Sequence, residues 1–285
     1  MTLAPHTNTL LIGCGYLGAV MVQKLAHATV TAVTRSELRH AVLAAAGVRC
    51  LSCDLSDPDG VRALAPQLAD FEGAVFLIAP PSAWRDEDPR PALDRVMGLL
   101  RGLPVSRAVL ASSTAVYGDA QGARVDAASP VQEADARAAK LLTIEEAWMS
   151  AGLDSYVVRL AGLYGPGRII GRDTVTRGET LPGSDQDWLN LVHIEDAARA
   201  MLATVTAASP LRYALISDGV PLSRGAYYRA LAERLARPAP RFGGAGGRRA
   251  GSRQCDSAAS WAALGLRPQW PDCRVALDAL LTHEA

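Results

Sequence analysis

The feature that most constrains this chain is the stretch GCGYLG at residues 13–18, which follows the apolar run TLLIG and opens a helical pattern. In a strand–turn–helix unit of this kind, Gly13 makes the tight turn, Gly15 lets a pyrophosphate approach the backbone, and Gly18 lets the helix pack on the strand. The helix N-terminus then faces the anion. The motif predicts a dinucleotide site contacted by Gly13, Gly15, Tyr16, Leu17 and Gly18, and the alternative interpretation is a tight turn that binds no ligand.

Short apolar runs alternate with helical patterns along the first 160 residues. Several runs are apolar on both faces, as expected for strands of a parallel sheet that helices cover on both sides. The expected strands are 9–13, 29–34, 48–53, 73–79, 107–112 and 155–160, and the expected helices are 17–28, 36–46, 58–69, 91–102 and 136–151. This alternation predicts an α/β fold, a Rossmann-type doubly wound parallel sheet.

The regular alternation of strands and helices ends after residue 160, where a long loop begins. We expect residues 1–160 to form the NAD(P)-binding domain. The segment 188–217, which ends in a predicted strand, is expected to rejoin that domain. The remaining segments, 161–187 and 218–285, are expected to form a small C-terminal substrate-binding lobe.

The charge balance and the cysteine content narrow the range of partners. Lys plus Arg and Asp plus Glu number 29 each, so the net charge is zero and neither nucleic acid nor a membrane is an expected partner. No apolar run reaches the ~20 residues of a membrane span, and the N-terminus lacks the pattern of a signal peptide. Five cysteines, an odd number, predict neither a disulfide framework nor a metal site. We therefore expect a cytoplasmic protein that binds a small-molecule substrate.

The end of the second predicted strand indicates which dinucleotide is bound. An NAD-preferring site places an acidic residue there, but this chain has Arg35, with Arg39 a turn later. A guanidinium can bind a ribose 2′-phosphate through two hydrogen bonds, so we expect NADP rather than NAD, unless these arginines are ordinary solvated side chains. Asp54, after the third strand, is a candidate partner for the adenine amino group. Pro80, after the fourth strand, is expected beside the ligand crevice.

Motifs spread over most of the chain carry a family resemblance. They are, in order, GCGYLG, ASSTAVYGD (111–119), VVRLAGLYGPGR (157–168), WLNLVHIEDAARAM (188–201) and YALISDGVPLSRGAYYRALAE (213–233). With these motifs the chain resembles the extended and atypical short-chain dehydrogenase/reductases, the NAD(P)-dependent epimerase/dehydratase group. The resemblance implies the fold and an NAD(P) cofactor but not the substrate, because members of this superfamily act on very different molecules.

The resemblance also implies roles for residues at the end of the fifth strand. In the family, a Ser or Thr four residues before the Tyr of the VYG motif hydrogen-bonds the reacting oxygen. That position is Ser113 here, with Thr114 as the reserve candidate and Ser112 expected beside the cofactor. A Tyr-x-x-x-Lys pair on the next helix exchanges the proton, which is needed because a carbonyl that accepts hydride becomes an alkoxide.

The Tyr of this pair is absent from the chain. If Lys140 is the family lysine, the acid position holds Ala136. If instead Glu145 is aligned with the glutamate usual in the family, the two positions hold Arg137 and Leu141. Arginine does not donate a proton near neutral pH. The chain therefore resembles a small subgroup of atypical members that lack the tyrosine.

Other side chains are candidates to supply the proton or to contact the substrate. Tyr117 lies one helical turn beyond the serine, and Tyr164 lies in the LYGPG loop. His193 carries an imidazole suited to proton transfer, with a structural role as the alternative. Arg168 and Asn190 correspond to positions where related proteins contact substrates, which favours a polar or anionic substrate.

Two functions fit these observations. The first is an NADP(H)-using oxidoreductase or epimerase-like enzyme that acts on a small polar carbonyl or imine metabolite. The second is a catalytically impaired NADP-binding sensor or protein-interaction module on the same fold. By analogy with the superfamily, a homodimer formed through the helices at 91–102 and 136–151 is also an expectation.

Overall fold

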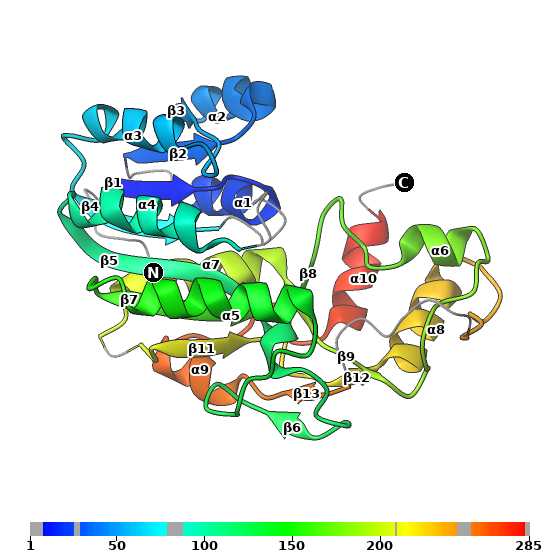
Figure 1. Cartoon of the computed structure of the whole chain (residues 1–285). Coiled ribbons are helices and arrows are strands. Elements are labelled where there is room, and N and C mark those ends of the chain that lie inside the picture. The colour runs from blue at the N-terminus through cyan, green and yellow to red at the C-terminus, as the bar shows by residue number, and fades with distance from the viewer. Residues whose placement is uncertain (1–7, 26–28, 79–87, 209, 244–251, 283–285) are drawn as a thin grey trace.

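The computed structural model describes residues 8–25, 29–78, 88–208, 210–243 and 252–282. Its centre is a seven-stranded parallel sheet in the order β11-β7-β5-β4-β1-β2-β3 (Figure 1). The strands are β1 (Asn8–Ile12), β2 (Val30–Thr34), β3 (Arg49–Ser52), β4 (Gly73–Leu77), β5 (Val105–Ser113), β7 (Ser155–Leu160) and β11 (Tyr213–Ile216). The predicted Rossmann-type doubly wound sheet is therefore confirmed.

The strand order reverses between β1 and β4. From β1 the chain runs outward to β2 and β3, and then returns to β4 on the other side of β1. In open α/β sheets, ligands bind outside the carboxyl ends of the strands at such a reversal, because the crossover helices leave a crevice there. The fold thus fixes where a dinucleotide can lie before any side chain is considered.

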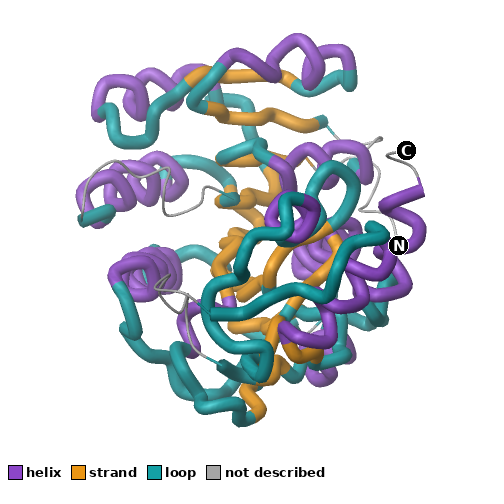
Figure 2. The backbone as a smooth tube through the Cα atoms, turned by 90° about the vertical axis from the view of Figure 1, so that its right-hand side faces the viewer, coloured by secondary structure: helices purple, strands orange, loops and turns teal. Residues whose placement is uncertain are grey.

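Helices cover both faces of the sheet (Figures 1 and 2). Because strand side chains alternate, Leu11 and Phe76 pack into one helical layer, whereas Leu10 and Leu77 pack into the other. The first layer contains α1 (Tyr16–Lys24), the short helices η1 (Glu37–Arg39) and α2 (His40–Ala45), and α7 (Ile194–Thr206). The second layer contains α3 (Pro58–Gln67), α4 (Arg90–Arg101) and α5 (Ala136–Met149).

A smaller lobe lies beyond the carboxyl edge of the sheet, where α6, α8 and α10 are grouped (Figure 1). Its apolar core includes Tyr164, Tyr227 and Leu277, all 1% exposed or less. The lobe helices are α6 (Arg172–Thr176), α8 (Arg224–Arg234) and α10 (Cys273–Thr282). Two short strand pairs connect it to the sheet domain: β8 (Gly162–Tyr164) with β10 (Leu191–His193), and β9 (Trp188–Leu189) with β12 (Leu222–Ser223).

The segment after residue 252 returns to the sheet domain. Its strand β13 (Gln254–Cys255) pairs with β6 (Arg124–Val125), near the short helix η3 (Thr114–Tyr117). Helix α9 (Ala258–Ala263) then packs on β11, where the Trp261 indole donates a hydrogen bond to the Ser217 carbonyl at 3.0 Å. The C-terminal segment expected in the lobe is therefore divided: β13 and α9 pack on the sheet domain, whereas α10 packs in the lobe. Within the described ranges, no helix is long and apolar enough to cross a membrane.

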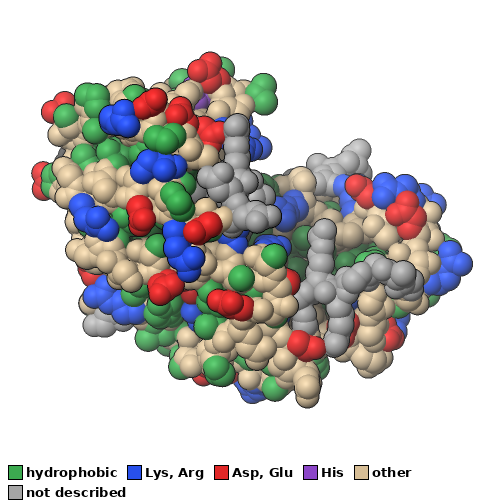
Figure 3. Space-filling model, viewed as in Figure 1, with side chains coloured by type: hydrophobic (Ala, Val, Ile, Leu, Met, Phe, Trp, Pro, Cys, Tyr) green, Lys and Arg blue, Asp and Glu red, His purple; other side chains and the backbone are tan. Residues whose placement is uncertain are grey.

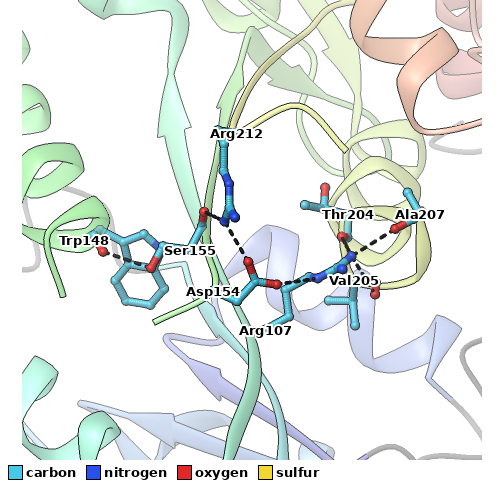
Figure 4. A network of polar contacts seen from close by, with 8 residues as sticks. All are labelled: Arg107, Trp148, Asp154, Ser155, Thr204, Val205, Ala207 and Arg212. Carbon is cyan, nitrogen blue, oxygen red and sulfur yellow. Dashed lines mark hydrogen bonds and ion pairs between the residues drawn. The ribbon is translucent and has the colours of Figure 1, made fainter. Parts of the chain in front are cut away.

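A polar network ties the opposite, amino edge of the sheet together (Figure 4). The Asp154 carboxylate pairs with Arg107 at 3.2 Å and with Arg212 at 2.7 Å. The Arg107 guanidinium also donates hydrogen bonds to the carbonyls of Thr204, Val205 and Ala207, at the C-terminal end of α7. These carbonyls lack helical N–H partners, so a cation there satisfies them and complements the helix dipole.

We predict that Arg107→Ala destabilises the fold by about 2 kcal/mol, because it leaves the last carbonyls of α7 without their donor. The melting temperature of a chain this size should fall by roughly 3–4 °C. The matched control is Arg62→Ala, since the one ion pair of Arg62 within the described residues is with the exposed Asp59 on α3, and its loss should cost less than about 0.5 kcal/mol. Equal losses of stability in the two variants, measured by thermal unfolding, would contradict the structural role of Arg107.

Candidate functional site

The glycine turn has the backbone geometry that the motif predicts. Gly13 follows β1 with a φ of +91°, a left-handed conformation that favours glycine. A Cβ on Gly18 would lie 3.2 Å from both the Gly13 carbonyl oxygen and Cys14 Sγ, so α1 packs tightly on the turn. The N-terminus of α1 has no side-chain cap, because its N-cap residue is Gly15. Its N–H groups, at the carboxyl edge of the sheet, fit the pyrophosphate of a dinucleotide.

A cleft of about 430 Å³ opens from this turn across the carboxyl ends of β1, β4, β5 and β7. The surface is hollowed between the sheet domain and the lobe (Figure 3). The cleft is lined by Gly13, Gly15, Tyr16, Leu17, Ile78, Ala111, Ser112, Ser113, Arg137, Leu141, Leu160, Ala161, Gly162, Leu163 and Arg168. The structure thus brings together the predicted glycine turn, two of the predicted hydroxyl residues and Arg168.

A buried ion pair attaches α5 to the sheet beside this cleft. The Glu145 carboxylate is 2.7 Å from the Arg159 guanidinium on β7, and both side chains are at most 6% exposed. The Ser112 hydroxyl on β5 donates a hydrogen bond to the same carboxylate, and Arg159 donates another to the Tyr117 hydroxyl at 3.1 Å. The charged groups are therefore paired and hydrogen-bonded, as burial requires.

This attachment decides which side chains of α5 face the cleft. Residues four apart lie on the same face of a helix, so Leu141 and Arg137 follow Glu145 toward the N-terminus along the face that meets the sheet. Both line the cleft, whereas Ala136 and Lys140 are not among its lining residues. The structure therefore favours the alignment in which Arg137 takes the acid position and Leu141 the lysine position. Lys140 stays only a sequence-based candidate for catalysis.

The hydroxyl of Ser113 lies at the end of β5 and lines the cleft. Its oxygen accepts a hydrogen bond from the Ala115 N–H at 3.3 Å, at the start of η3. The hydroxyl hydrogen is left to donate toward a ligand. Thr114, the reserve candidate, is 4% exposed and is not among the lining residues.

Tyr117 does not reach the cleft. Its side chain is 1% exposed, and the Arg159 guanidinium lies 5.1 Å from its ring centre. Burial raises the pKa of Tyr117, although the hydrogen bond from Arg159 opposes the shift. This position gives no support to the hypothesis that Tyr117 exchanges a proton with a substrate in the cleft.

Tyr164 also points away from the cleft. Side chains alternate along β8, so Leu163 lines the cleft while Tyr164 enters the core of the lobe, edge-on to His193. The Tyr164 hydroxyl is buried and has no hydrogen-bond partner within the described part of the chain. Burial, and then the negative charge of Asp218, raise its pKa. A proton held this tightly, outside the cleft, is poorly placed for catalysis.

The lobe core also contains the buried Asp218 carboxyl, which is 4% exposed. Burial raises its pKa to about 8, while a hydrogen bond from the Val220 N–H opposes the shift. The neighbouring described groups that interact with it electrostatically include Tyr164, Cys255, Cys273 and Asp272. Between about pH 4 and pH 8, the Asp218 carboxyl is therefore mostly protonated in the folded state and mostly ionised in the unfolded state.

We predict that this raised pKa makes folding stability fall as pH rises from about 4 to about 8, because over this range the folded state holds a proton that the unfolded state has lost. Asp218→Asn stays neutral at every pH, so its stability advantage over the natural chain should widen, by at most about 1.4 kcal/mol per pH unit. Thermal unfolding of both proteins at pH 5, 6, 7 and 8 measures this difference. Parallel curves would show that Asp218 titrates normally.

The loop after β8 closes the far side of the cleft and contacts the glycine turn. The Tyr16 hydroxyl donates a hydrogen bond to the Pro166 carbonyl at 3.0 Å, and the Arg168 guanidinium lies 5.8 Å from the Tyr16 ring centre. A Cβ on Gly165 would lie 2.8 Å from the Tyr16 hydroxyl oxygen, so glycine permits this approach. Burial raises the pKa of Tyr16 to about 12, with Arg168 opposing the shift. No motif in the sequence predicts this contact.

Two predicted substrate residues have structural partners instead. The Asn190 amide donates to the Arg253 carbonyl at 2.9 Å and accepts from the Cys255 N–H at 2.8 Å, which holds the C-terminal segment in place. His193 is 2% exposed and caps α7, where Nδ1 accepts from the Glu195 N–H at 3.3 Å. Burial lowers the pKa of His193. Neither residue is among those that line the cleft.

The predicted ribose and adenine contacts lie outside this cleft, at the ends of β2 and β3. Arg35 is exposed and has neither an ion pair nor a hydrogen bond of its side chain within the described residues, and Arg39 is exposed near Cys14. The Asp54 carboxylate accepts a hydrogen bond from the Ser56 N–H at 3.1 Å. Pro80 lies outside the described residues.

Comparisons with known proteins agree with this geometry. Residues 10–214 match the NAD dependent epimerase/dehydratase family. Protein YeeZ of Escherichia coli K12 is 30% identical over 230 residues, which cover 78% of this chain and 77% of YeeZ. A Methylobacillus flagellatus protein provisionally assigned as an NAD-dependent epimerase/dehydratase superposes with a TM-score of 0.79 at 25% identity, covering 98% of each chain. MoeE5 in complex with UDP-glucose and NAD has a TM-score of 0.77 at 22% identity, covering 96% of this chain and 97% of MoeE5, and so shares the fold.

The doubly wound sheet, the glycine turn and the cleft at the strand reversal define a dinucleotide-binding enzyme of the Rossmann type. More specifically, the chain belongs to the NAD-dependent epimerase/dehydratase family. It is thus an NAD(P)-dependent enzyme of the short-chain dehydrogenase/reductase type, as the sequence motifs imply.

Proposed function

We propose that this chain is an NADP(H)-dependent oxidoreductase or epimerase-like enzyme that acts on a small polar carbonyl or imine metabolite. One observation carries the proposal. The glycine turn, the Ser113 hydroxyl and the start of α5 border a single cleft at the strand reversal, so a nicotinamide and a substrate would meet beside the serine.

The residues of the cleft suit hydride transfer more than proton transfer. The cofactor, when bound, would supply or accept the hydride. Ser113 would donate a hydrogen bond to the reacting oxygen or nitrogen, and Leu141, Leu160 and Leu163 would limit the access of water. Tyr16 is the one tyrosine among the described lining residues, and its raised pKa and its hydrogen bond to the Pro166 carbonyl make it a poor proton source. An imine needs less help here, because its nitrogen is more basic than a carbonyl oxygen.

The size of the cleft supports a small substrate. At about 430 Å³ it lies near the lower end of the ~300–1,000 Å³ typical of small-molecule sites. A nicotinamide would take up much of that volume. The UDP-glucose in the name of MoeE5 is bulkier than the substrate proposed here.

We predict that the protein binds NADPH more tightly than NADH, and that Arg35→Ala weakens NADPH binding by roughly 10- to 100-fold while leaving NADH binding unchanged. The reason is that a guanidinium at the end of β2 contacts only the extra 2′-phosphate, through charge-assisted hydrogen bonds. Titration of nicotinamide fluorescence measures both affinities. Arg62→Ala is the control, since Arg62 lies on α3 and pairs with Asp59. Equal binding of the two nucleotides would remove the NADP preference, and binding of neither would remove the oxidoreductase proposal.

The missing phenol favours a second candidate, a dinucleotide-responsive sensor or interaction module without turnover. A panel of small carbonyl and imine compounds, tested with NADPH deuterated at C4, distinguishes the two. We predict deuterium transfer to at least one compound, detected by mass spectrometry, with Ser113→Ala lowering kcat by about 10²–10³-fold. Tight NADPH binding with no transfer to any compound would favour the sensor.

A further inference from the structure

The charged side chains among the described residues that line the cleft are all of one sign. They are Arg137 and Arg168, with no carboxylate and no lysine among the described lining residues. Arg137 enters from the first turn of α5 on the sheet side, and Arg168 enters from the loop after β8 on the lobe side. Two guanidinium groups on opposite walls create a positive potential in a small, partly apolar space.

Neither arginine is neutralised by another described residue. Within the described part of the chain, no ion pair or side-chain hydrogen bond involves Arg137 or Arg168, and both residues are exposed. Arg168 lies over the Tyr16 ring, and Tyr16 is itself anchored to the Pro166 carbonyl. The Arg168 side chain is therefore positioned by an aromatic contact that leaves its N–H donors available.

Arg137 occupies a position that helix stability does not explain. A cation in the first turn of a helix opposes the helix dipole, and Asp135 already caps α5 by accepting a hydrogen bond from the Ala138 N–H at 2.7 Å. The ion pair of Glu145 with Arg159 turns this face of α5 toward the cleft, so the guanidinium is directed there by buried contacts two turns away. Arg137 is exposed, so its guanidinium is open to an anion that enters the cleft.

We propose that Arg137 and Arg168 bind an anionic group of the substrate, a carboxylate or a phosphate, close to the reacting centre held by Ser113. The inference rests on the proposed function and narrows its substrate class to small anionic oxo or imino compounds. Arg137 stands where related enzymes carry the proton donor, and it does not donate a proton near neutral pH. It can bind a carboxylate or phosphate through two parallel hydrogen bonds.

The test uses the full chain saturated with NADP⁺, so that the glycine turn no longer competes for anions. Oxalate, inorganic phosphate and oxamide, the neutral analogue of oxalate, are titrated separately by calorimetry. We expect at least one of the two anions to bind and oxamide to bind at least tenfold more weakly than oxalate. We expect Arg137→Gln and Arg168→Gln each to raise the Kd of the bound anion by at least tenfold. Tighter binding of oxalate or of phosphate identifies which group the substrate carries.

Arg229→Gln is the matched control, because Arg229 is an exposed arginine on α8 that does not line the cleft. Oxamide binding as tightly as the anions, or anion affinities unchanged in both cleft variants, would overturn the inference. NADP⁺ binding is measured first in every variant and reports on the proposed function separately. If NADP⁺ does not bind, the proposed function fails, and the same oxalate and phosphate titrations on the free protein still decide whether the two arginines bind anions.

Discussion

The buried ion pair between Glu145 and Arg159 is the interaction on which the arrangement of the site depends. Removing two charges from water is costly, and it is tolerated only when their hydrogen-bonding groups are satisfied. Here the carboxylate receives the guanidinium and the Ser112 hydroxyl, and the guanidinium also reaches the Tyr117 hydroxyl. Losing any one partner would leave a buried charge short of bonds. The network therefore holds α5 in one orientation about its own axis and at one position along β5 and β7.

That constraint carries over to the chemistry of the cleft. With Glu145 fixed on the sheet, Leu141 and Arg137 line the cleft, whereas Lys140 is not among its described lining residues. The opposite wall is set by a second contact between distant segments, in which Tyr16 of the glycine turn holds the loop that bears Arg168. Among the described residues, the two walls together bring the Ser113 hydroxyl, two guanidinium groups and apolar side chains to one cleft. This lining is compatible with the anionic ligand and the hydride transfer proposed above.

The sequence predicts the sheet, its crossovers and the glycine turn because these depend on local patterns. A buried parallel strand is apolar over its whole length, and Gly13 must accept a positive φ wherever this turn forms. The family resemblance, rather than a local pattern, singled out Ser113 at the end of β5 and Arg168, and both line the cleft. It did not separate the two alignments of α5, since Ala136 with Lys140 and Arg137 with Leu141 are both compatible with the helical pattern. It also did not show where Tyr117 and Tyr164 point.

The sequence by itself determined that this protein is a Rossmann-type, dinucleotide-binding member of its family without the usual catalytic tyrosine, because motifs and missing residues are read directly from the chain. Only the tertiary structure decided which side chains meet in the cleft. Leu163 and Tyr164 are neighbours in sequence, yet strand alternation directs one to the ligand and the other to the lobe core. The orientation of α5 about its own axis likewise follows from the ion pair between Glu145 and Arg159. Arg159 lies on β7, which comes after α5 in the chain. Contacts of this kind depend on how whole elements pack against one another, which no local pattern specifies.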